Sequence, residues 1–238
     1  FLNDNIYINL INKNSDNKPS SDFLFKMSDL NLSIKGNFLS PKKNNFMLEG
    51  KVSIKKDKHK FVGIVKYEDS KIIINKSNLR SPFLDGKLEG IINFLPYFNF
   101  NLDLSLKSLN FTKLYNYFLS LDDERKKKLF RISNKINGNL SFSSDKIYSS
   151  YNLTKSFESQ IKLNNGNILI EQFLISLGKL GAADILGGIN NEKKFSSFKY
   201  ESNIFIDNQK KFISKFGIYN KKDLPPNLFV SGNFDLQN

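Results

Sequence analysis

The sequence of 238 residues contains no cysteine, no tryptophan and one histidine, His59. Without cysteine, a disulfide framework and a thiolate metal site are both excluded, and a single histidine leaves almost no route to a zinc site. His59 lies in the basic stretch KKDKHKF, which is typical of a solvated surface residue. Because no pattern pairs a base with a nucleophile, we expect no catalytic residue, no metal, no cofactor and no enzyme activity.

Long hydrophobic runs are also missing. No apolar run reaches the roughly 18 residues that a membrane-spanning helix needs. The sequence begins with Phe1 and not with methionine. We therefore expect a fragment of a longer protein, with any signal or membrane anchor upstream of Phe1.

Acidic residues are outnumbered by basic ones, 23 against 36, which gives a formal net charge of +13. A solvated lysine surface, attraction to anionic lipid headgroups and attraction to nucleic acid each explain such a charge. Short clusters occur at Lys126–Lys128 and at Lys55, Lys56, Lys58 and Lys60, while the other lysines are scattered. Because a nucleic-acid face usually concentrates its basic residues, no nucleic-acid partner is expected, and a basic nucleic-acid-binding β protein is kept as an alternative.

Alternation of apolar and polar residues is the dominant pattern, and it predicts β-strands. The expected strands in the first half are Leu30–Phe38, Phe46–Ile54, Phe61–Tyr67, Lys71–Lys76, Leu84–Phe94 and Phe98–Leu106. The YEDS sequence between the third and fourth of these predicts a hairpin. The fold class that follows is mainly β: an extended, curved antiparallel sheet that is groove-like and contains repeats.

One segment has helical spacing instead. Between Phe111 and Ile136, apolar residues recur at Phe111, Leu114, Tyr115 and Phe118, and then at Leu129, Ile132 and Ile136. This predicts a short helical insertion around residues 111–136, made of two helices that break near Ser120. Asp122, Asp123 and Glu124 would lie at a helix start, where carboxylates complement the helix dipole better than they suggest a metal site.

Strands are expected again after Ile136, in GNLSFSS, KIYSSYNL, FESQIKL, GNILIEQFLISL, KLGAADILGGI, KKFSSFKYESNIFI and LFVSGNFDL. Asn165-Gly166 predicts a tight hairpin, because both central residues of a type I′ turn need positive φ. The stretch Gly178–Gly188 lacks the glycine spacing and the βαβ context of a dinucleotide loop. A GxxG loop of the RNA-binding KH type is also disfavoured, because the preceding residues alternate like a strand. We expect a turn at Gly178 and a returning strand.

An internal repeat is visible in the second half. Asn99–Phe118 resembles Phe198–Ile218: each has an alternating strand, a polar step and a short amphipathic segment with paired aromatics. Each is followed by a similar strand, at Asn137–Phe142 and at Ser231–Leu236, and Ile34–Ser40 repeats the same G-N-[LF] sequence. Repeats of a strand-rich unit predict an extended sheet.

The pattern over Lys135–Ile189 resembles the C-terminal region of the AsmA-like family, which includes TamB-type envelope proteins. The matching positions are Gly138, Leu140, Ile161, Leu163, Asn165, Gly166, Ile168, Ile170, Gly181 and Gly188. The resemblance implies a periplasmic protein of the bacterial envelope, anchored in the inner membrane by a helix outside this sequence. It also implies a long twisted sheet whose apolar groove carries phospholipids toward the outer membrane. It divides the chain into a β-rich part, 1–98, and an AsmA-like part, 99–238.

The abundant phenylalanines allow three uses: filling a buried strand face, stacking on single-stranded nucleic acid, or forming an open apolar face that binds acyl chains. We expect the third use, a non-enzymatic protein in lipid transport or envelope assembly. Phospholipid and envelope assembly proteins would be its partners. The candidates for the lipid groove are Phe142, Ile168, Ile170 and Phe173. A structural or surface β-repeat protein is a further alternative.

Overall fold

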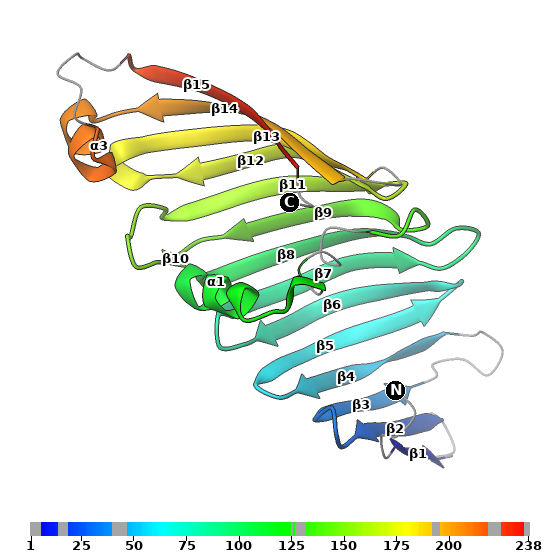
Figure 1. The fold of residues 1–238 in the computed structure, drawn as a ribbon. Coiled ribbons are helices and arrows are strands. Elements are labelled where there is room, and N and C mark those ends of the chain that lie inside the picture. Colours follow the sequence, from blue (N-terminus) through cyan, green and yellow to red (C-terminus); the bar gives the residue numbers. More distant parts are fainter. Residues whose placement is uncertain are drawn as a thin grey trace. The chain divides into compact units, whose positions relative to one another are not determined.

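A computed structural model describes residues 6–13, 19–39, 47–124, 126, 132–191, 196–218 and 225–235. The described residues form one mostly antiparallel, open sheet of 15 strands with short helices, so the predicted mainly-β fold class is confirmed (Figure 1). Neighbouring strands follow one another in chain order from β1 to β9 and from β11 to β15, while β10 pairs with β8 outside this path.

The strands of the first half are β1 (Ile6–Lys13), β2 (Ser20–Met27), β3 (Leu32–Leu39), β4 (Leu48–Lys56), β5 (His59–Glu68), β6 (Lys71–Arg80), β7 (Leu84–Asn93) and β8 (Asn99–Asn110). Each stretch predicted in the first half overlaps one strand, and β5, β6 and β8 are longer than the stretches that predict them. The sequence analysis does not predict β1 and β2. Phe46, where the strand corresponding to β4 is predicted to begin, lies outside the described residues.

The strands of the second half are β9 (Asn137–Ser144), β10 (Ile147–Tyr148), β11 (Ser156–Asn164), β12 (Asn167–Ser176), β13 (Gly181–Asn191), β14 (Ser196–Ile206) and β15 (Asn227–Asp235). The prediction of a regular strand over KIYSSYNL is wrong, because β10 has two residues and pairs in parallel with β8. The chain turns directly after it, with Asn152 donating its N–H to the Ser149 carbonyl at 3.1 Å.

The tight turns follow from residues that tolerate positive φ. Asn165 and Gly166 have φ of 51° and 87°, and they join β11 to β12 as the predicted two-residue hairpin. Asp69 and Ser70, with φ of 46° and 59°, join β5 to β6 in the same way. Gly178, at φ 62°, opens the 3₁₀ turn η1 (Gly178–Leu180), from which β13 returns antiparallel to β12 as predicted.

Two described helices each follow a strand and an asparagine cap. The Asn110 side chain accepts from the Lys113 N–H at the start of α1 (Phe111–Leu119), and Asn208 does the same for Lys211 in α3 (Gln209–Phe216). An asparagine at this position satisfies an N–H that has no partner within the helix. The internal repeat seen in the sequence therefore corresponds to a repeated structure. In each copy the alternating segment is a strand, the polar step contains the asparagine cap, and the amphipathic segment is a helix.

The second half of the predicted helical insertion is only partly described. Asp123, Glu124 and Lys126 are helical, and Leu129 lies outside the described residues. The helical spacing at Ile132 and Ile136 is misleading, because these residues are not helical and the Ile136 N–H bonds to Ser133 in a turn. Asn137 follows at once and accepts from the Asn165 N–H at 2.9 Å, which holds this stretch at the β11–β12 hairpin.

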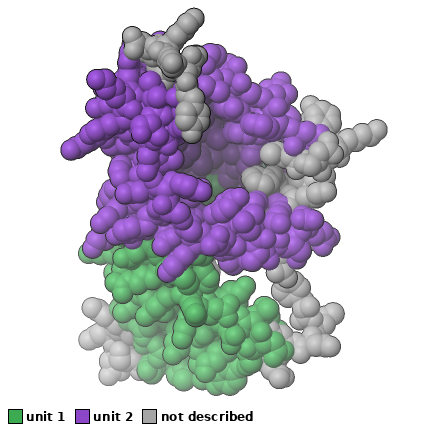
Figure 2. Space-filling model, turned by 60° about the vertical axis from the view of Figure 1, so that its left-hand side comes forward, with its two compact units in different colours: residues 1–105 green, residues 106–238 purple. Residues whose placement is uncertain are grey.

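The chain divides into two compact units, residues 1–105 and residues 106–238, called unit 1 and unit 2 here (Figure 2). The boundary between them falls within β8. The division at 98/99 that the sequence predicts stays a prediction. The surface of unit 2 is hollowed on the side that Figure 2 shows.

Candidate functional site

The strand register of unit 2 collects apolar side chains on one face of the sheet. Residues directly opposite one another on neighbouring antiparallel strands point to the same side. The residues that share this side form the apolar face of unit 2: Leu140, Phe142, Phe157, Ile161, Leu163, Ile168, Ile170, Phe173, Ile175, Ala183, Ile185, Ile189, Phe198, Tyr200, Ile204, Leu228, Val230 and Phe234.

All four residues predicted for the groove lie on this face. Phe142 on β9 and Phe173 on β12 are both register partners of Ser159 on β11, one on each side. Ile168 and Ile170 continue the same row along β12. The four side chains are half-buried, so each keeps surface that a ligand could contact. Their role in lipid binding stays a prediction.

A β-bulge places Phe173 on this face. Simple alternation along β12 would put Phe173 on the side opposite Ile168 and Ile170, because it lies three residues after Ile170. The register instead shifts between Ile170 and Phe173, so that Ile161 faces Ile170 while Ser159 faces Phe173. Such a bulge bends the strand and increases its twist. The bulge therefore bends β12 and keeps its apolar residues on one side.

Aromatic contacts run across the strands of this face. The Phe157 ring lies edge-on to Phe142 at 4.8 Å and to Phe173 at 5.4 Å between ring centroids. Near β15, Tyr200 stacks on Phe198 at 5.6 Å and on Phe234 at 5.8 Å. The sequence analysis did not select these additional aromatics, although their alternation along the strands is a signal that could have identified them.

Gly232 makes room for this second aromatic row. A Cβ added at Gly232 would come within 2.6 Å of a ring carbon of Tyr200, its register partner on β14. The Tyr200 ring therefore lies over the glycine backbone, an arrangement that supports a strand weakened by a missing side chain. In the G-N-[LF] sequence at Ser231–Leu236, the glycine is therefore explained by the room that the Tyr200 ring needs.

Each described helix of unit 2 contacts a short neighbouring element: α1 contacts β10, and α3 contacts η1. Thr112 of α1 shares a hydrogen bond with Ser150, 3.0 Å between hydroxyl oxygens, and receives one from the Ser150 N–H. Among the described residues, ten hydrophobic side chains are buried and 28 large ones are exposed, so much apolar surface remains accessible.

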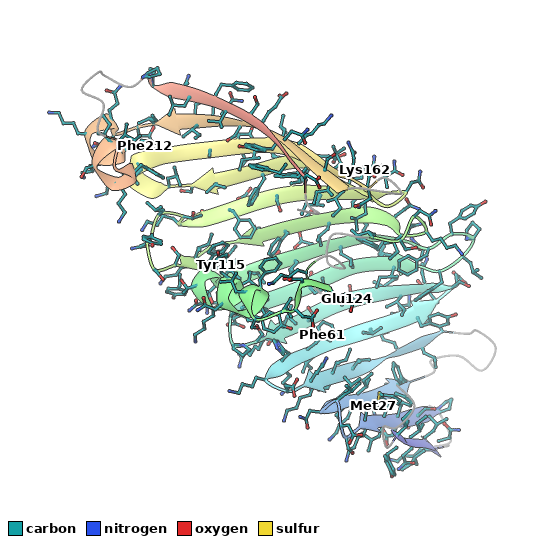
Figure 3. The ribbon with its side chains drawn as sticks, in the orientation of Figure 1. Met27, Phe61, Tyr115, Glu124, Lys162 and Phe212 are labelled. Carbon is teal, nitrogen blue, oxygen red and sulfur yellow. The ribbon has the colours of Figure 1, made fainter. Side chains whose placement is uncertain are left out.

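The other face of unit 2 is mostly polar. Its register rows contain Glu158 and Lys162 on β11 and Lys199 and Glu201 on β14. The apolar exceptions on this face are Leu169, Leu174, Leu186, Phe205 and Phe229. Lys162 is labelled in Figure 3 on β11. The charged residues of these strands therefore lie on the side opposite to Phe142, Phe157 and Phe173.

Unit 1 repeats this division by its own register. Ile8, Phe25, Ile34, Ile54 and Phe61 form one row across β1 to β5. Met27 and Phe61 on this face are labelled in Figure 3. The opposite face carries lysines, among them Lys35, Lys51 and Lys55. The register of β6 shifts between Ile74 and Leu79, where Lys76 has φ of 46°. This bulge keeps Ile74 and Leu79 in the apolar rows.

Two carboxyl groups in unit 1 have shifted pKa values. Lys13 donates to Asp22 at 2.8 Å, and with the Asn37 amide it holds the pKa of Asp22 below its ordinary value. Lys66, which lies 2.6 Å from Glu68, lowers the pKa of that carboxyl, with a smaller effect from Lys71. Both shifts are explained by ion pairs at solvent-accessible positions, so they do not indicate an acid–base site.

Within the described ranges, no group of three His, Cys, Asp or Glu side chains could hold a metal ion. In the same part of the chain, no helix has the length and hydropathy needed to span a membrane.

Comparison with known proteins gave no match: no family model, curated protein or solved structure is significantly similar to this chain. The apolar face and its surroundings therefore provide the basis for a functional assignment.

Proposed function

We propose that this chain is a non-enzymatic envelope protein that contacts or carries phospholipids on an apolar sheet face, in outer-membrane lipid transport or assembly. The observation that carries the proposal is the half-buried apolar face of unit 2, with Phe142, Ile168, Ile170 and Phe173 in adjoining register rows. The resemblance to AsmA-like proteins adds a periplasmic location, an inner-membrane anchor outside these residues and envelope assembly proteins as partners.

Acyl chains suit this face because binding them requires apolar contact and no reactive group. Transfer of hydrocarbon out of water contributes about 0.8 kcal/mol per buried CH₂ group. A face that is continuous over β9 and β11 to β15 offers many such contacts without demanding a single geometry. Binding also costs the lipid chain some of its rotational freedom. This cost opposes the gain from apolar contact, so partial burial along a long surface favours reversible carriage over permanent capture.

The division of the strands into two faces favours lipid over single-stranded nucleic acid. Nucleic-acid binding combines stacked bases with a basic groove that follows the backbone. In unit 2, Phe157 and Phe173 lie on one side of the sheet, while Lys162 and Lys199 lie on the other. A strand of nucleic acid that stacked on the aromatics of the apolar face would therefore have to reach the other side of the sheet to contact these lysines.

The proposal is tested by photo-crosslinking the full chain to a phospholipid with a diazirine in its acyl chain. Ile170→Asp puts a charge on the apolar face, whereas Leu169→Asp puts the same charge next to it on the opposite face. We expect Ile170→Asp to lose most of the crosslinking and Leu169→Asp to retain it, and Ile168→Asp to behave like Ile170→Asp.

Both variants must keep the circular dichroism spectrum of the wild type, which is expected because neither Ile170 nor Leu169 is buried. Equal crosslinking in the Ile170 and Leu169 variants would contradict the assignment of the face. Native mass spectrometry of protein purified with mild detergent gives a second measurement. A mass without retained phospholipid would favour a structural β-repeat protein.

A further inference from the structure

Five lysines from three separate segments gather around one hollow of unit 2. The hollow has a volume of about 780 Å³, and its lysines are Lys155, Lys179, Lys210, Lys211 and Lys215. This group is called the lysine basin here. It differs from the two lysine clusters visible in the sequence, because its members come from the segment before β11, from η1 and from α3.

Backbone hydrogen bonds hold the first two segments of the basin together. The Lys155 N–H donates to the Ser176 carbonyl at 2.8 Å, and the Lys155 carbonyl accepts from the Ile147 N–H at the same distance. The Lys155 ammonium donates to the Asn152 side-chain oxygen at 2.8 Å. Gly178 packs closely against the Lys155 side chain, since a Cβ there would lie 3.2 Å from Lys155 Cγ.

The third segment, α3, is fixed to the same edge. The Asp207 N–H donates to the Leu180 carbonyl at 3.1 Å, which connects the start of α3 to η1. Phe212 is buried and packs on Phe216 with 4.4 Å between ring centroids (Figure 3). Lys211 and Lys215, which flank Phe212 on α3, are exposed. The helix is therefore anchored by its apolar side while its lysines remain accessible.

Among the described residues, no carboxylate lines the lysine basin. In the part of the chain that the structure describes, none of its five lysines forms an ion pair. Lys210 and Lys211 also occupy the first turn of α3, where the helix dipole is positive and acidic residues are preferred. Bringing these charges together is unfavourable, and a bound anion would relieve the repulsion.

We propose that the lysine basin binds phosphate, as a phospholipid headgroup or as a free phosphate compound. Lysine ammonium groups bind phosphate as point charges, and the hollow is of the size of small-ligand sites. A phospholipid headgroup as the source of the phosphate rests on the proposed function, because the same lipid would place its acyl chains on the apolar face. The phosphate site itself depends on α3, η1 and Lys155 alone.

The test compares two triple variants of the full chain that remove the same charge. Lys179→Gln, Lys210→Gln and Lys211→Gln alter the lysine basin, whereas Lys55→Gln, Lys56→Gln and Lys58→Gln alter exposed lysines of unit 1. Lys155 is left in place because its ammonium group bonds to Asn152. Binding is measured to phosphatidylcholine vesicles with and without phosphatidylglycerol by flotation, and to inorganic pyrophosphate by calorimetry.

We expect the basin variant to bind at least about tenfold more weakly, since each lost phosphate contact removes a charge interaction of the kind that dominates such binding, and the unit 1 variant to bind like the wild type. Loss restricted to phosphatidylglycerol vesicles would identify a lipid headgroup, and loss with pyrophosphate as well would identify a general phosphate site. Equal losses in both variants, or no binding by the wild type, would overturn the proposal.

Acyl-chain crosslinking distinguishes this proposal from the proposed function. If the basin variant loses phosphate binding while wild-type crosslinking is absent, the phosphate site stands without the acyl-chain face. If crosslinking depends on Ile170 but phosphate binding does not depend on the lysine basin, the reverse holds.

Discussion

Unit 1 and unit 2 use their basic residues differently. In unit 1, Lys13 pairs with Asp22, Lys66 with Glu68 and Arg80 with Asp85, at 2.8, 2.6 and 3.5 Å between the charged atoms. Unit 2 also has an ion pair, Lys126 with Asp123 at 3.4 Å, but five of its lysines line one hollow at which no described carboxylate lies. The net charge of +13 therefore combines two arrangements of basic residues. Some basic residues are paired with a carboxylate on a neighbouring strand position, and others gather where an anion could bind.

The two units also differ in their connections. Unit 1 joins most of its strands by short turns, whereas unit 2 contains the described helices α1 and α3. The features they share are the bulged strands, β6 in unit 1 and β12 in unit 2, which keep apolar residues on one side. We infer that the apolar face is the common element of the two units.

The largest expected effect concerns the buried residues of unit 2. Leu106 is 1% exposed, and its carbonyl accepts from the Asp145 N–H at 3.0 Å. Leu106→Ala should lower the free energy of unfolding by about 3 kcal/mol, because it leaves a cavity where neighbours cannot fully collapse. Leu186→Ala, at a side chain that is 46% exposed, should cost less than about 1 kcal/mol on the same scale. Urea unfolding measures both, and similar losses would contradict the difference in burial.

Two buried serines compare the apolar faces of the units directly. In unit 1, the Ser77 hydroxyl accepts from the Leu88 N–H at 2.6 Å and donates to the Leu88 carbonyl. In unit 2, the Ser159 hydroxyl donates to the Phe142 carbonyl at 2.8 Å. Since an unsatisfied buried group costs about 1–3 kcal/mol, Ser77→Ala should be more destabilising than Ser159→Ala by about 1 kcal/mol. Thermal unfolding of both variants gives the order, and a larger loss for Ser159→Ala would refute it.

The caps of the two helices offer a third comparison. Asn110→Ala and Asn208→Ala should each cost about 1 kcal/mol, because each leaves a helix N–H without its acceptor. Only Asn208→Ala should also weaken pyrophosphate binding, since α3 carries three lysines of the lysine basin and α1 carries none. Calorimetry on both variants separates these effects. Equal weakening by the two variants would show that loss of stability, and not the position of α3, is responsible.

The smallest expected effect is the response of the unit 1 ion pairs to acid. Lys66 lowers the pKa of Glu68 below its ordinary 4.5, so the pair stabilises the folded state above that pH. This contribution is lost as the pH falls below 4.5 and through the lower pKa of the folded state. Glu68→Gln should therefore melt at a slightly lower temperature than the wild type at neutral pH and at the same temperature in strong acid. A difference that grew on acidification would have the wrong sign.

Much of the strand pattern could be predicted because alternation is a local property. The hairpin at Asn165-Gly166 and the strand returning after Gly178 follow from residues that accept positive φ. Ile132 and Ile136 show where local spacing fails, since their segment is held at another hairpin through Asn137 and Asn165. KIYSSYNL fails for a similar reason, because β10 pairs with β8, which is distant in the sequence.

The sequence by itself determined that this protein is mainly β, with apolar and polar residues alternating along its strands, because this alternation is a local property that does not depend on the final packing. Only the tertiary structure decided which rows adjoin, since a bulge changes the register of every residue that follows it. It alone also gathered Lys155, Lys179 and the α3 lysines around one hollow. These lysines are far apart along the chain, and only the hydrogen bonds that fix η1 and α3 bring them together.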